Sequence, residues 1–304
     1  MARVRAIEQL VDEFVARRPI RSTSLIVTLF GDVISQHGGV IWLGSLVECL
    51  GQLGIDERLV RTSTFRLVKE GWLSSDRVGR RSFYSFTGYG RREYERAARR
   101  IYRLQPPPWD GGWTLLLPLA VPEDARDPFR KSMRWQGFGN LATNVFAHPG
   151  SERGSLDEAL AELGLDDKVV VMQASTDAAQ SERLIKEVLW QNWNLAELAE
   201  RYCGFIERFR PVLRAVKRAA GLAPAQCFRT RVLLIHEYRR ILLHDTDVPE
   251  ALLPVDWPGS AARRLSAELY GLVAQGSAEY IESTLEAEDA LVPRAAASFW
   301  LRFN

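Results

Sequence analysis

Basic side chains are concentrated in residues 57–87, where their spacing would allow them to bind a polyanion. At 100° per residue, a helix over residues 57–70 would present one polar face. That face would carry Arg58, Arg61, Thr62, Phe65, Arg66 and Lys69. An arginine can donate two hydrogen bonds to the O6 and N7 atoms of guanine, and a threonine hydroxyl can bond a base or a phosphate. The spacing therefore predicts a helix that contacts DNA.

Phe65 is the apolar member of this face. Its ring could contact a thymine methyl group, or it could pack beneath a neighbouring element. Because aromatic side chains of small domains are more often core than contact residues, we expect Phe65 to pack beneath the hairpin predicted after this helix. The opposite face, which we also expect to be packed, carries Val60, Ser63, Thr64, Leu67 and Val68.

A basic hairpin is predicted directly after this helix. Residues 73–86 alternate as two strands would, with Gly79 at the tip. Arg77, Arg80 and Arg81 lie around the tip and could reach phosphates or a minor groove. Such contacts add affinity that falls with salt and carry little sequence information. A basic helix followed by a basic hairpin is the layout of a winged helix-turn-helix DNA reader, and it indicates a regulator rather than an enzyme.

The residues before the basic helix complete this layout. A helix is predicted over residues 25–36, a short strand over 39–43 and a second helix over 46–53, with Ser45 as its cap. Asp56 is the expected cap of the basic helix. A further basic helix is predicted over residues 90–104.

Charge is distributed unevenly along the chain. Residues 1–104 hold 18 Lys and Arg against 11 Asp and Glu, whereas the remaining 200 residues hold 22 against 27. A basic excess that coincides with a compact motif steers association toward a polyanion. The first third of the chain is therefore the expected nucleic-acid-binding part.

The pattern changes after a Pro- and Gly-rich linker at residues 105–112. Strands predicted at 113–119, 141–147 and 168–174 alternate with helices at 128–137, 156–163 and 179–189, as in a ferredoxin-like α/β sandwich. From residue 191 the chain is predicted to be mainly helical. The expected fold class is therefore α+β and multidomain. It comprises a winged helix-turn-helix over residues 1–104, a ferredoxin-like domain over 105–190, and a helical effector or dimerisation domain over 191–304.

Membrane insertion and export are not expected. No apolar run approaches the roughly 20 residues that span a bilayer. Glu8, Asp12 and Glu13 lie where a signal peptide would be apolar. We therefore expect a cytoplasmic protein with no membrane partner.

Catalytic and metal-binding patterns are missing. Cys49, Cys203 and Cys227 have no CxxC spacing, and the four histidines show no metal-ligand pairing beyond a single distant couple. The chain has no GxSxG sequence, no Walker-type loop and no GxGxxG after a strand. We therefore expect no metal site and no cofactor, and a protein that is not an enzyme.

Several short motifs, spread over nearly the whole chain, are similar to those of a known family. They are Thr23-Ser24-Leu25-Ile26, Ile41-Trp42-Leu43-Gly44-Ser45-Leu46, Arg61-Thr62, Phe65-Arg66-Leu67, Glu70-Gly71-Trp72-Leu73, Gly79-Arg80-Arg81-Ser82-Phe83-Tyr84-Ser85, Trp135-Gln136-Gly137-Phe138-Gly139, Phe209-Arg210-Pro211, Leu233-Leu234-Ile235-His236, Tyr238-Arg239-Arg240 and Glu250-Ala251-Leu252-Leu253-Pro254. On these motifs the sequence resembles the PaaX family, transcriptional repressors of phenylacetic acid degradation operons. The resemblance implies a homodimer that binds a pseudo-palindromic operator and releases it when phenylacetyl-CoA binds.

The resemblance also implies a central domain like that of Cas2, whose nuclease members carry a metal-binding aspartate on the first strand. Here residues 113–120 contain no acidic side chain, and the first acids are Glu123 and Asp124. A two-metal nuclease needs carboxylates that converge on one site. We therefore expect this domain to act as a spacer or dimerisation unit.

A CoA ester requires cations for its phosphates and an apolar slot for its acyl group. The candidate effector-binding residues are His236, Tyr238, Arg239, Arg240, Arg208, Arg210 and Trp193. His236 could equally be a packed core histidine, and Arg239 and Arg240 could pair with Asp245.

Three other functions stay open at this point. The protein could be a sequence-specific regulator with a different small-molecule effector, or an architectural DNA protein without a ligand. The least supported alternative is an acyl-CoA-processing enzyme that uses His236 as a base, because the chain lacks a nucleophile constellation.

Overall fold

The structure is a computed structural model of the 304-residue chain and describes residues 4–17, 19–105, 108–150, 153–176, 179–288 and 290–303. The chain divides into two compact units, each built from separate stretches of sequence. The first unit comprises Met1–Leu104, Cys203–Leu243 and Ser260–Asn304, and the second comprises Gln105–Tyr202 and His244–Gly259. Most of the C-terminal helices thus form one unit with the N-terminal elements, while the division into three consecutive domains remains a prediction.

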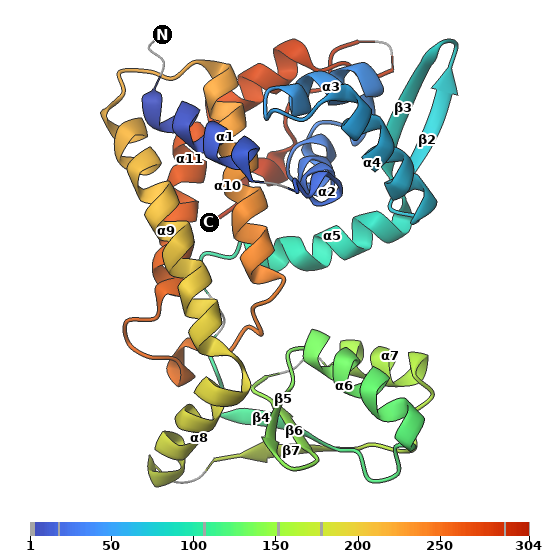
Figure 1. The fold of residues 1–304 in the computed structure, drawn as a ribbon, viewed down its shortest axis with the longest axis vertical. Coiled ribbons are helices and arrows are strands. Elements are labelled where there is room, and N and C mark those ends of the chain that lie inside the picture. The colour runs from blue at the N-terminus through green and yellow to red at the C-terminus, as the bar shows by residue number, and fades with distance from the viewer. Residues whose placement is uncertain are drawn as a thin grey trace. The chain divides into compact units, whose positions relative to one another are not determined.

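The first unit is mainly helical. It contains α1 (Arg5–Ala16), α2 (Ser22–Asp32), β1 (Val40–Trp42), α3 (Leu43–Gly51), α4 (Glu57–Lys69), β2 (Leu73–Val78), β3 (Arg81–Phe86), α5 (Gly88–Ile101), α10 (Pro224–Leu242), and most of α9 (Leu195–Arg218) and α11 (Pro258–Thr284). Figure 1 shows α10 running through this unit among α1, α2 and α5, all of which it contacts.

Helices α2 and α10 form the centre of this core. Both helices are buried along most of their length, and the buried residues of α10 include charged side chains such as Arg231 and Arg239. Close packing at α2 depends on Gly31, because a Cβ atom there would lie 2.2 Å from the ring of Tyr94 on α5. This contact holds α5 against the end of α2.

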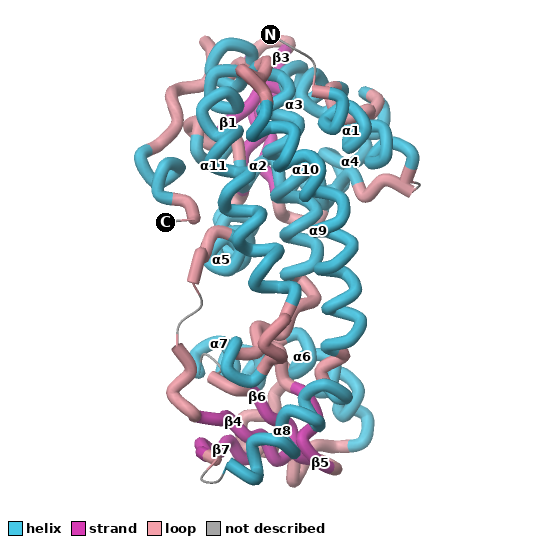
Figure 2. Tube along the Cα trace, turned by 90° about the vertical axis from the view of Figure 1, so that its left-hand side faces the viewer, coloured by secondary structure: helices cyan, strands magenta, loops and turns pink. Residues whose placement is uncertain are grey.

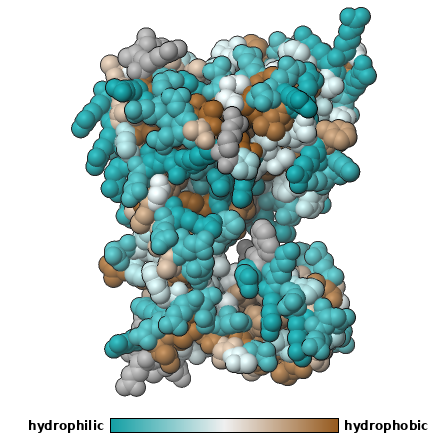
Figure 3. Space-filling model, in the orientation of Figure 1, coloured by the Kyte–Doolittle hydropathy of each residue, from teal (hydrophilic) through white to brown (hydrophobic). Residues whose placement is uncertain are grey.

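A small antiparallel sheet completes the unit, with strand order β1-β3-β2. Val78 pairs with Arg81 across a two-residue turn whose first residue, Gly79, has φ 61°. Glycine adopts this conformation without the steric cost that other residues incur. The hairpin extends beyond the helices of its unit (Figure 1), and its tip is covered by hydrophilic side chains (Figure 3).

The second unit contains β4 (Gly112–Leu117), α6 (Arg126–Trp135), β5 (Gly139–Ala142), β6 (Val145–His148), α7 (Arg153–Glu162), β7 (Val170–Ser175), α8 (Ala179–Asn192) and the start of α9. Its antiparallel sheet has the order β5-β6-β4-β7, and the elements from β4 to β7 follow the β-α-β-β-α-β sequence of a ferredoxin-like motif. Helices α6 and α7 cover one face of the sheet (Figure 2), where they bury Leu116, Phe129, Phe146 and Leu160.

Several predicted boundaries are wrong. The single strand expected over residues 141–147 is a hairpin, because Asn144, with φ 58°, reverses the chain between β5 and β6. The helix expected over residues 25–36 ends at Asp32 and is followed by a 3-10 turn, Ile34–Gln36. Ser45 does not cap a helix: α3 begins at Leu43, and the Ser45 hydroxyl accepts a hydrogen bond from the backbone N–H of Glu286.

The two elements expected to bind DNA are confirmed as a helix and a hairpin. Helix α4 begins where it was predicted to begin, since the Asp56 carboxylate accepts the Leu59 N–H at 2.8 Å as an N-cap. Strands β2 and β3 lie within the predicted residues 73–86.

Within the described residues, no helix is both long and apolar enough to cross a membrane. The same part of the chain holds no group of three or more His, Cys, Asp or Glu side chains that could bind a metal ion.

Candidate nucleic-acid interface

Helix α4 presents a basic face to solvent. Its buried side chains are Val60, Ser63, Thr64 and Leu67, in agreement with the predicted inward face. The six residues predicted on the outward face are all exposed: Arg58, Arg61, Thr62, Phe65, Arg66 and Lys69. The structure therefore brings five hydrogen-bond donors and one aromatic ring together on a single surface.

Two arginines of this face form ion pairs within the helix. Arg61 contacts the carboxylate of Glu57 at 2.6 Å, and Arg66 contacts that of Glu70 at 2.7 Å. The Thr62 hydroxyl donates to a backbone carbonyl. Exposed i,i+4 pairs contribute only about 0.3–0.5 kcal/mol, so a nucleic acid could displace either carboxylate at small cost.

The expectation that Phe65 packs beneath the hairpin is wrong. Its side chain is 71% exposed, so neither the hairpin nor another described element covers it. Periodicity placed Phe65 on this face correctly, and the error came from the general tendency of aromatic residues to be buried.

The arginines of the hairpin are not equivalent. Arg77 and Arg80 are exposed, and the Arg77 Nε donates to the carbonyl of Gly79 at 3.2 Å. Arg81 instead lies over the Trp42 ring, 4.4 Å from its centroid, and contacts the Glu286 carboxylate at 2.7 Å. Arg81 is therefore already engaged by a carboxylate from the segment after α11.

His236 and Tyr238, two of the residues predicted to bind an effector, are packed inside the first unit. The Nδ1 atom of His236 lies 3.3 Å from the Thr28 hydroxyl, and its ring meets Phe14 edge-on. Burial lowers the pKa of His236 to about 3, so the ring is neutral near pH 7. Tyr238 packs against Phe205. These contacts match the alternative of a packed core histidine.

Two of the predicted arginines are neutralised by one carboxylate. Glu237 contacts Arg208 at 2.6 Å, Arg240 at 3.3 Å and also Arg17 at 3.0 Å. Arg210, on the same helix as Arg208, is exposed. Arg208 and Arg240 are thus brought together with Arg17 in an ion-pair cluster that ties the end of α1 to α9 and α10.

Arg239 differs from these arginines because it is buried without a carboxylate. Only 7% of the residue is exposed, and its single hydrogen bond among the described residues joins Nη1 to the Ser24 hydroxyl at 3.3 Å. Its Nε finds no acceptor in the same part of the chain. Burial lowers the pKa of its guanidinium, although the phenol groups of Tyr94 and Tyr102 partly oppose this effect.

Trp193, the seventh predicted residue, belongs to the other compact unit. Its indole N–H donates to the Gly137 carbonyl at 3.1 Å, and a Cβ atom at Gly139 would lie 2.5 Å from its ring. Trp193 therefore packs on the turn between α6 and β5.

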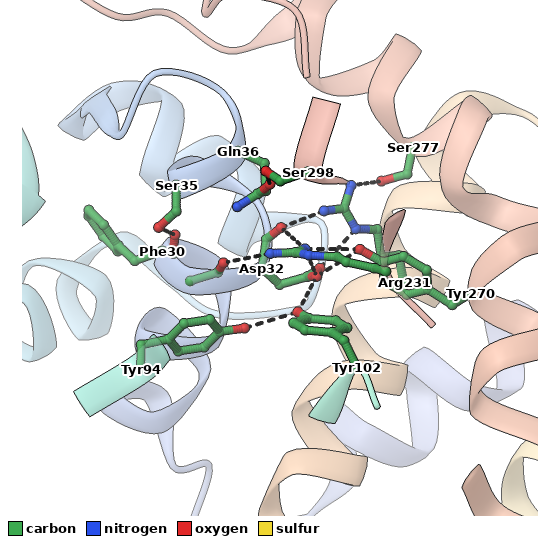
Figure 4. A network of polar contacts seen from close by, with 12 residues as sticks. Phe30, Asp32, Ser35, Gln36, Tyr94, Tyr102, Arg231, Tyr270, Ser277 and Ser298 are labelled. Atoms are coloured by element: carbon green, nitrogen blue, oxygen red, sulfur yellow. Dashed lines mark hydrogen bonds and ion pairs between the residues drawn. The ribbon is translucent and has the colours of Figure 1, made fainter. Parts of the chain in front are cut away.

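The sequence interpretation missed a buried polar network between α2 and the C-terminal part of the first unit (Figure 4). The Asp32 carboxylate contacts Arg231 Nε at 2.8 Å and Arg302 Nη1 at 2.7 Å. It also accepts the hydroxyls of Tyr102, at 2.6 Å, and Tyr270, at 3.0 Å. The sequence contained one signal for this network, which is Arg231 directly before the apolar run Val232–Ile235. A charge in an apolar part of a helix is costly unless it is paired, so this arginine indicated a buried carboxylate partner.

Comparison with known proteins matches most of the chain. Residues 21–90 match the family model of the PaaX-like protein, residues 106–185 the PaaX protein central Cas2-like domain, and residues 193–283 the PaaX-like protein C-terminal domain. The chain is 40% identical over 287 residues to the transcriptional repressor PaaX of Escherichia coli (strain K12). The aligned region covers 94% of this chain and 91% of the relative. The chain belongs to the PaaX family.

Family membership confirms two of the expectations. The Escherichia coli member of the PaaX family is a transcriptional repressor, so the relative is a regulator and not an enzyme. The Cas2-like match of residues 106–185 agrees with the ferredoxin-like order of the second unit. A solved structure, the uncharacterized protein Rv0674 from Mycobacterium tuberculosis, is also similar, with a TM-score of 0.48 and 23% identity over 77% of this chain and 88% of that one.

The Arg81–Glu286 contact in this PaaX-family chain gives a testable prediction. Glu286→Gln removes the carboxylate that holds Arg81, so Arg81 becomes available to a DNA phosphate. We expect affinity for operator and random duplexes alike to rise about two- to fivefold, which corresponds to the free energy that one exposed ion pair contributes. Fluorescence anisotropy at several salt concentrations would also show that DNA affinity falls more steeply with salt, with about one more ion released on binding.

Glu187→Gln is the matched control for this prediction, because Glu187 forms an exposed ion pair with Arg183 on α8. Unchanged affinity and salt slope in Glu286→Gln would mean that Arg81 remains on Trp42 and does not contact DNA.

Proposed function

We propose that the protein is a DNA-binding transcriptional repressor of phenylacetate catabolic genes that binds its operator as a homodimer in the cytoplasm. An aryl-acyl-CoA, phenylacetyl-CoA, releases it from the operator. The observation that carries the proposal is the exposed basic face of α4, followed directly by a protruding basic hairpin. The repressor function of the 40% identical relative supports the same conclusion.

In this proposal, α2 to β3 form a winged helix-turn-helix. Gly54, with φ 73°, supports the turn between α3 and α4, and the β2–β3 hairpin is the wing. Helix α4 enters the major groove, where Arg58, Arg61, Thr62, Arg66 and Lys69 contact bases and phosphates. Arg77 and Arg80 of the wing contact the DNA backbone, and Arg81 does so when it exchanges the Glu286 carboxylate for a phosphate.

The effector is proposed to bind near the end of α10. Of the candidate cations, Arg208 and Arg240 share the carboxylate of Glu237, whereas Arg239 is buried and has no carboxylate among the described residues. A buried cation without a counter-charge is costly, and a phosphate or carboxylate of a ligand would offset that cost. Arg239 is therefore the proposed anchor, with Arg240, Arg208 and Arg210 of the same unit as the other proposed cations.

The proposed roles of helix and wing predict different binding defects. Arg61→Ala and Arg66→Ala are each expected to weaken operator binding by about 1–3 kcal/mol and to relax the base preference at one position. Arg80→Ala is expected to weaken binding to all sequences equally and to reduce the salt slope by about one. A gel-shift titration with the operator, its single-base variants and a random duplex separates these outcomes.

Arg201→Ala is the matched control, because Arg201 forms the same kind of exposed i,i+4 pair, with Glu197, on α9. Identical defects in the helix and wing variants would contradict the assigned roles. The same titration with phenylacetyl-CoA, and with CoA as the control, tests the effector: specific binding that ignores the thioester would favour a regulator with another ligand.

A further inference from the structure

Phe65 is an exposed aromatic residue in the middle of the basic face of α4. At 71% exposure it is the most exposed phenylalanine among the described large apolar side chains. Of its neighbours on the helix surface, Arg61, Thr62 and Lys69 are polar or charged, and only Val68, three residues on, is apolar and half-buried. Single exposed apolar residues are ordinary on protein surfaces. The position of Phe65 within a proposed base-reading face gives it a specific chemical role.

The ion pairs on α4 leave this ring accessible. Arg61 extends toward the N-terminal end of the helix, where Nε donates to Glu57 at 2.8 Å. Arg66 extends toward the C-terminal end, where Nε donates to Glu70 at 2.7 Å. The two guanidinium groups therefore point away from Phe65 in opposite directions, and neither stacks on its ring.

The chemistry of the DNA groove identifies one partner for such a ring. A phenyl ring has no hydrogen-bond donor or acceptor, so it gains little from phosphates or from the polar edges of bases. The thymine 5-methyl group is the apolar group that the major groove displays, and aromatic side chains are among those that contact it. Cytosine, with a hydrogen atom at the same position, would leave the ring without this contact.

We propose that Phe65 contacts the 5-methyl group of a thymine in each operator half-site and thereby selects thymine at that position. This inference rests on the proposed function, because it requires α4 to enter the major groove. The flanking arginines then read neighbouring positions by hydrogen bonds, while Phe65 reads one position by apolar contact. Phe65 thus determines specificity without forming a polar contact.

The test removes the methyl group from the DNA and the ring from the protein, singly and together. Each thymine of the operator is replaced in turn by deoxyuridine, which keeps the base pair and lacks only the 5-methyl group. Dissociation constants are measured by fluorescence anisotropy for the unmodified chain and for Phe65→Ala. A buried methyl group contributes about fourfold in affinity. We therefore expect about a fourfold loss at one thymine per half-site for the unmodified chain and no further loss for Phe65→Ala at that site.

Phe65→Leu and Leu272→Ala provide the controls. Phe65→Leu keeps an apolar side chain and is expected to retain part of the methyl preference. Leu272 is 46% exposed on α11, so Leu272→Ala removes an exposed apolar group outside α4 and should leave the pattern unchanged. Because Phe65 is not part of the core, the thermal midpoint of Phe65→Ala should equal that of the unmodified chain.

Two results would overturn the inference while leaving the proposed function standing. Specific operator binding that tolerates every deoxyuridine would show that no thymine methyl is read. An equal methyl effect in the unmodified chain and Phe65→Ala would assign the contact to another residue. If the unmodified chain does not prefer the operator over random DNA, the proposed function fails, and the inference fails with it.

Discussion

Asp32→Asn is expected to lower the free energy of unfolding by about 3–5 kcal/mol, because it leaves two buried guanidinium groups without their counter-charge. Arg231 is fully buried, and the Arg302 side chain is 9% exposed. Asparagine keeps the shape of the side chain and removes the charge. The midpoint of urea unfolding, followed by circular dichroism, measures the change.

Two further variants test this explanation. In Asp32→Asn combined with Arg231→Met, one of the buried charges is also removed, so part of the lost stability should return. Glu57→Gln removes an exposed carboxylate and should change stability by less than about 0.5 kcal/mol. A loss in Asp32→Asn no larger than that in Glu57→Gln would show that the network does not stabilise the fold.

The acid dependence of stability should change in the same variant. Burial by itself raises the pKa of the Asp32 carboxyl, but the charges of Arg231 and Arg302 outweigh burial and hold it below its ordinary value. A carboxyl whose folded pKa is depressed contributes stability above its unfolded pKa of about 3.9, and this contribution is lost as the pH falls through the folded pKa. As the pH is lowered from about 5 to about 2, Asp32→Asn should therefore lose less stability than the unmodified chain.

Arg239→Met is expected to give a repressor that binds its operator normally and no longer responds to its effector. Operator affinity should stay within about twofold, because Arg239 is buried on α10 and is not part of α4 or the hairpin. The phenylacetyl-CoA concentration that releases half of the DNA should rise at least tenfold, about the 1.5–3 kcal/mol of a charged hydrogen bond. Competition gel shifts measure both quantities.

The stability of Arg239→Met distinguishes a ligand-binding role from a structural one. Without a carboxylate partner, the buried guanidinium costs free energy, so methionine should raise the thermal midpoint or leave it unchanged. Arg214→Met is the control, since Arg214 is an exposed arginine on α9 that is not one of the proposed effector residues. Unchanged induction in Arg239→Met would remove this residue from the effector site, and a large fall in the midpoint would assign it a structural role.

The network around Asp32 and the position of Arg239 connect the proposed DNA reader to the C-terminal helices. Asp32 and Ser24 both lie on α2, and they contact Arg231 and Arg239 of α10. A ligand that moves the end of α10 would therefore act directly on α2, which packs against α4. This physical connection is what an effector-controlled repressor requires.

The sequence by itself determined the elements whose signals are local. Helix α4 was predicted because its apolar residues recur with helical spacing after the Asp56 cap, and these features need no distant partner. The hairpin was predicted because strand alternation and the glycine at its tip act within fourteen residues. The exposed basic face of α4 followed from the same periodicity, and the family motifs spread along the chain were readable in the same way.

Only the tertiary structure decided the features that depend on distant segments. Arg231 meets Asp32 across 199 positions and Arg81 meets Glu286 across 205, and no local pattern specifies such partners. The exposure of Phe65 depends on whether another element covers α4, which periodicity does not state. Arg239 and Arg240 are identical neighbours in sequence, yet one is buried without a carboxylate and the other pairs with Glu237. Their difference arises because helix packing, and not residue type, sets the burial and the counter-charge of each guanidinium.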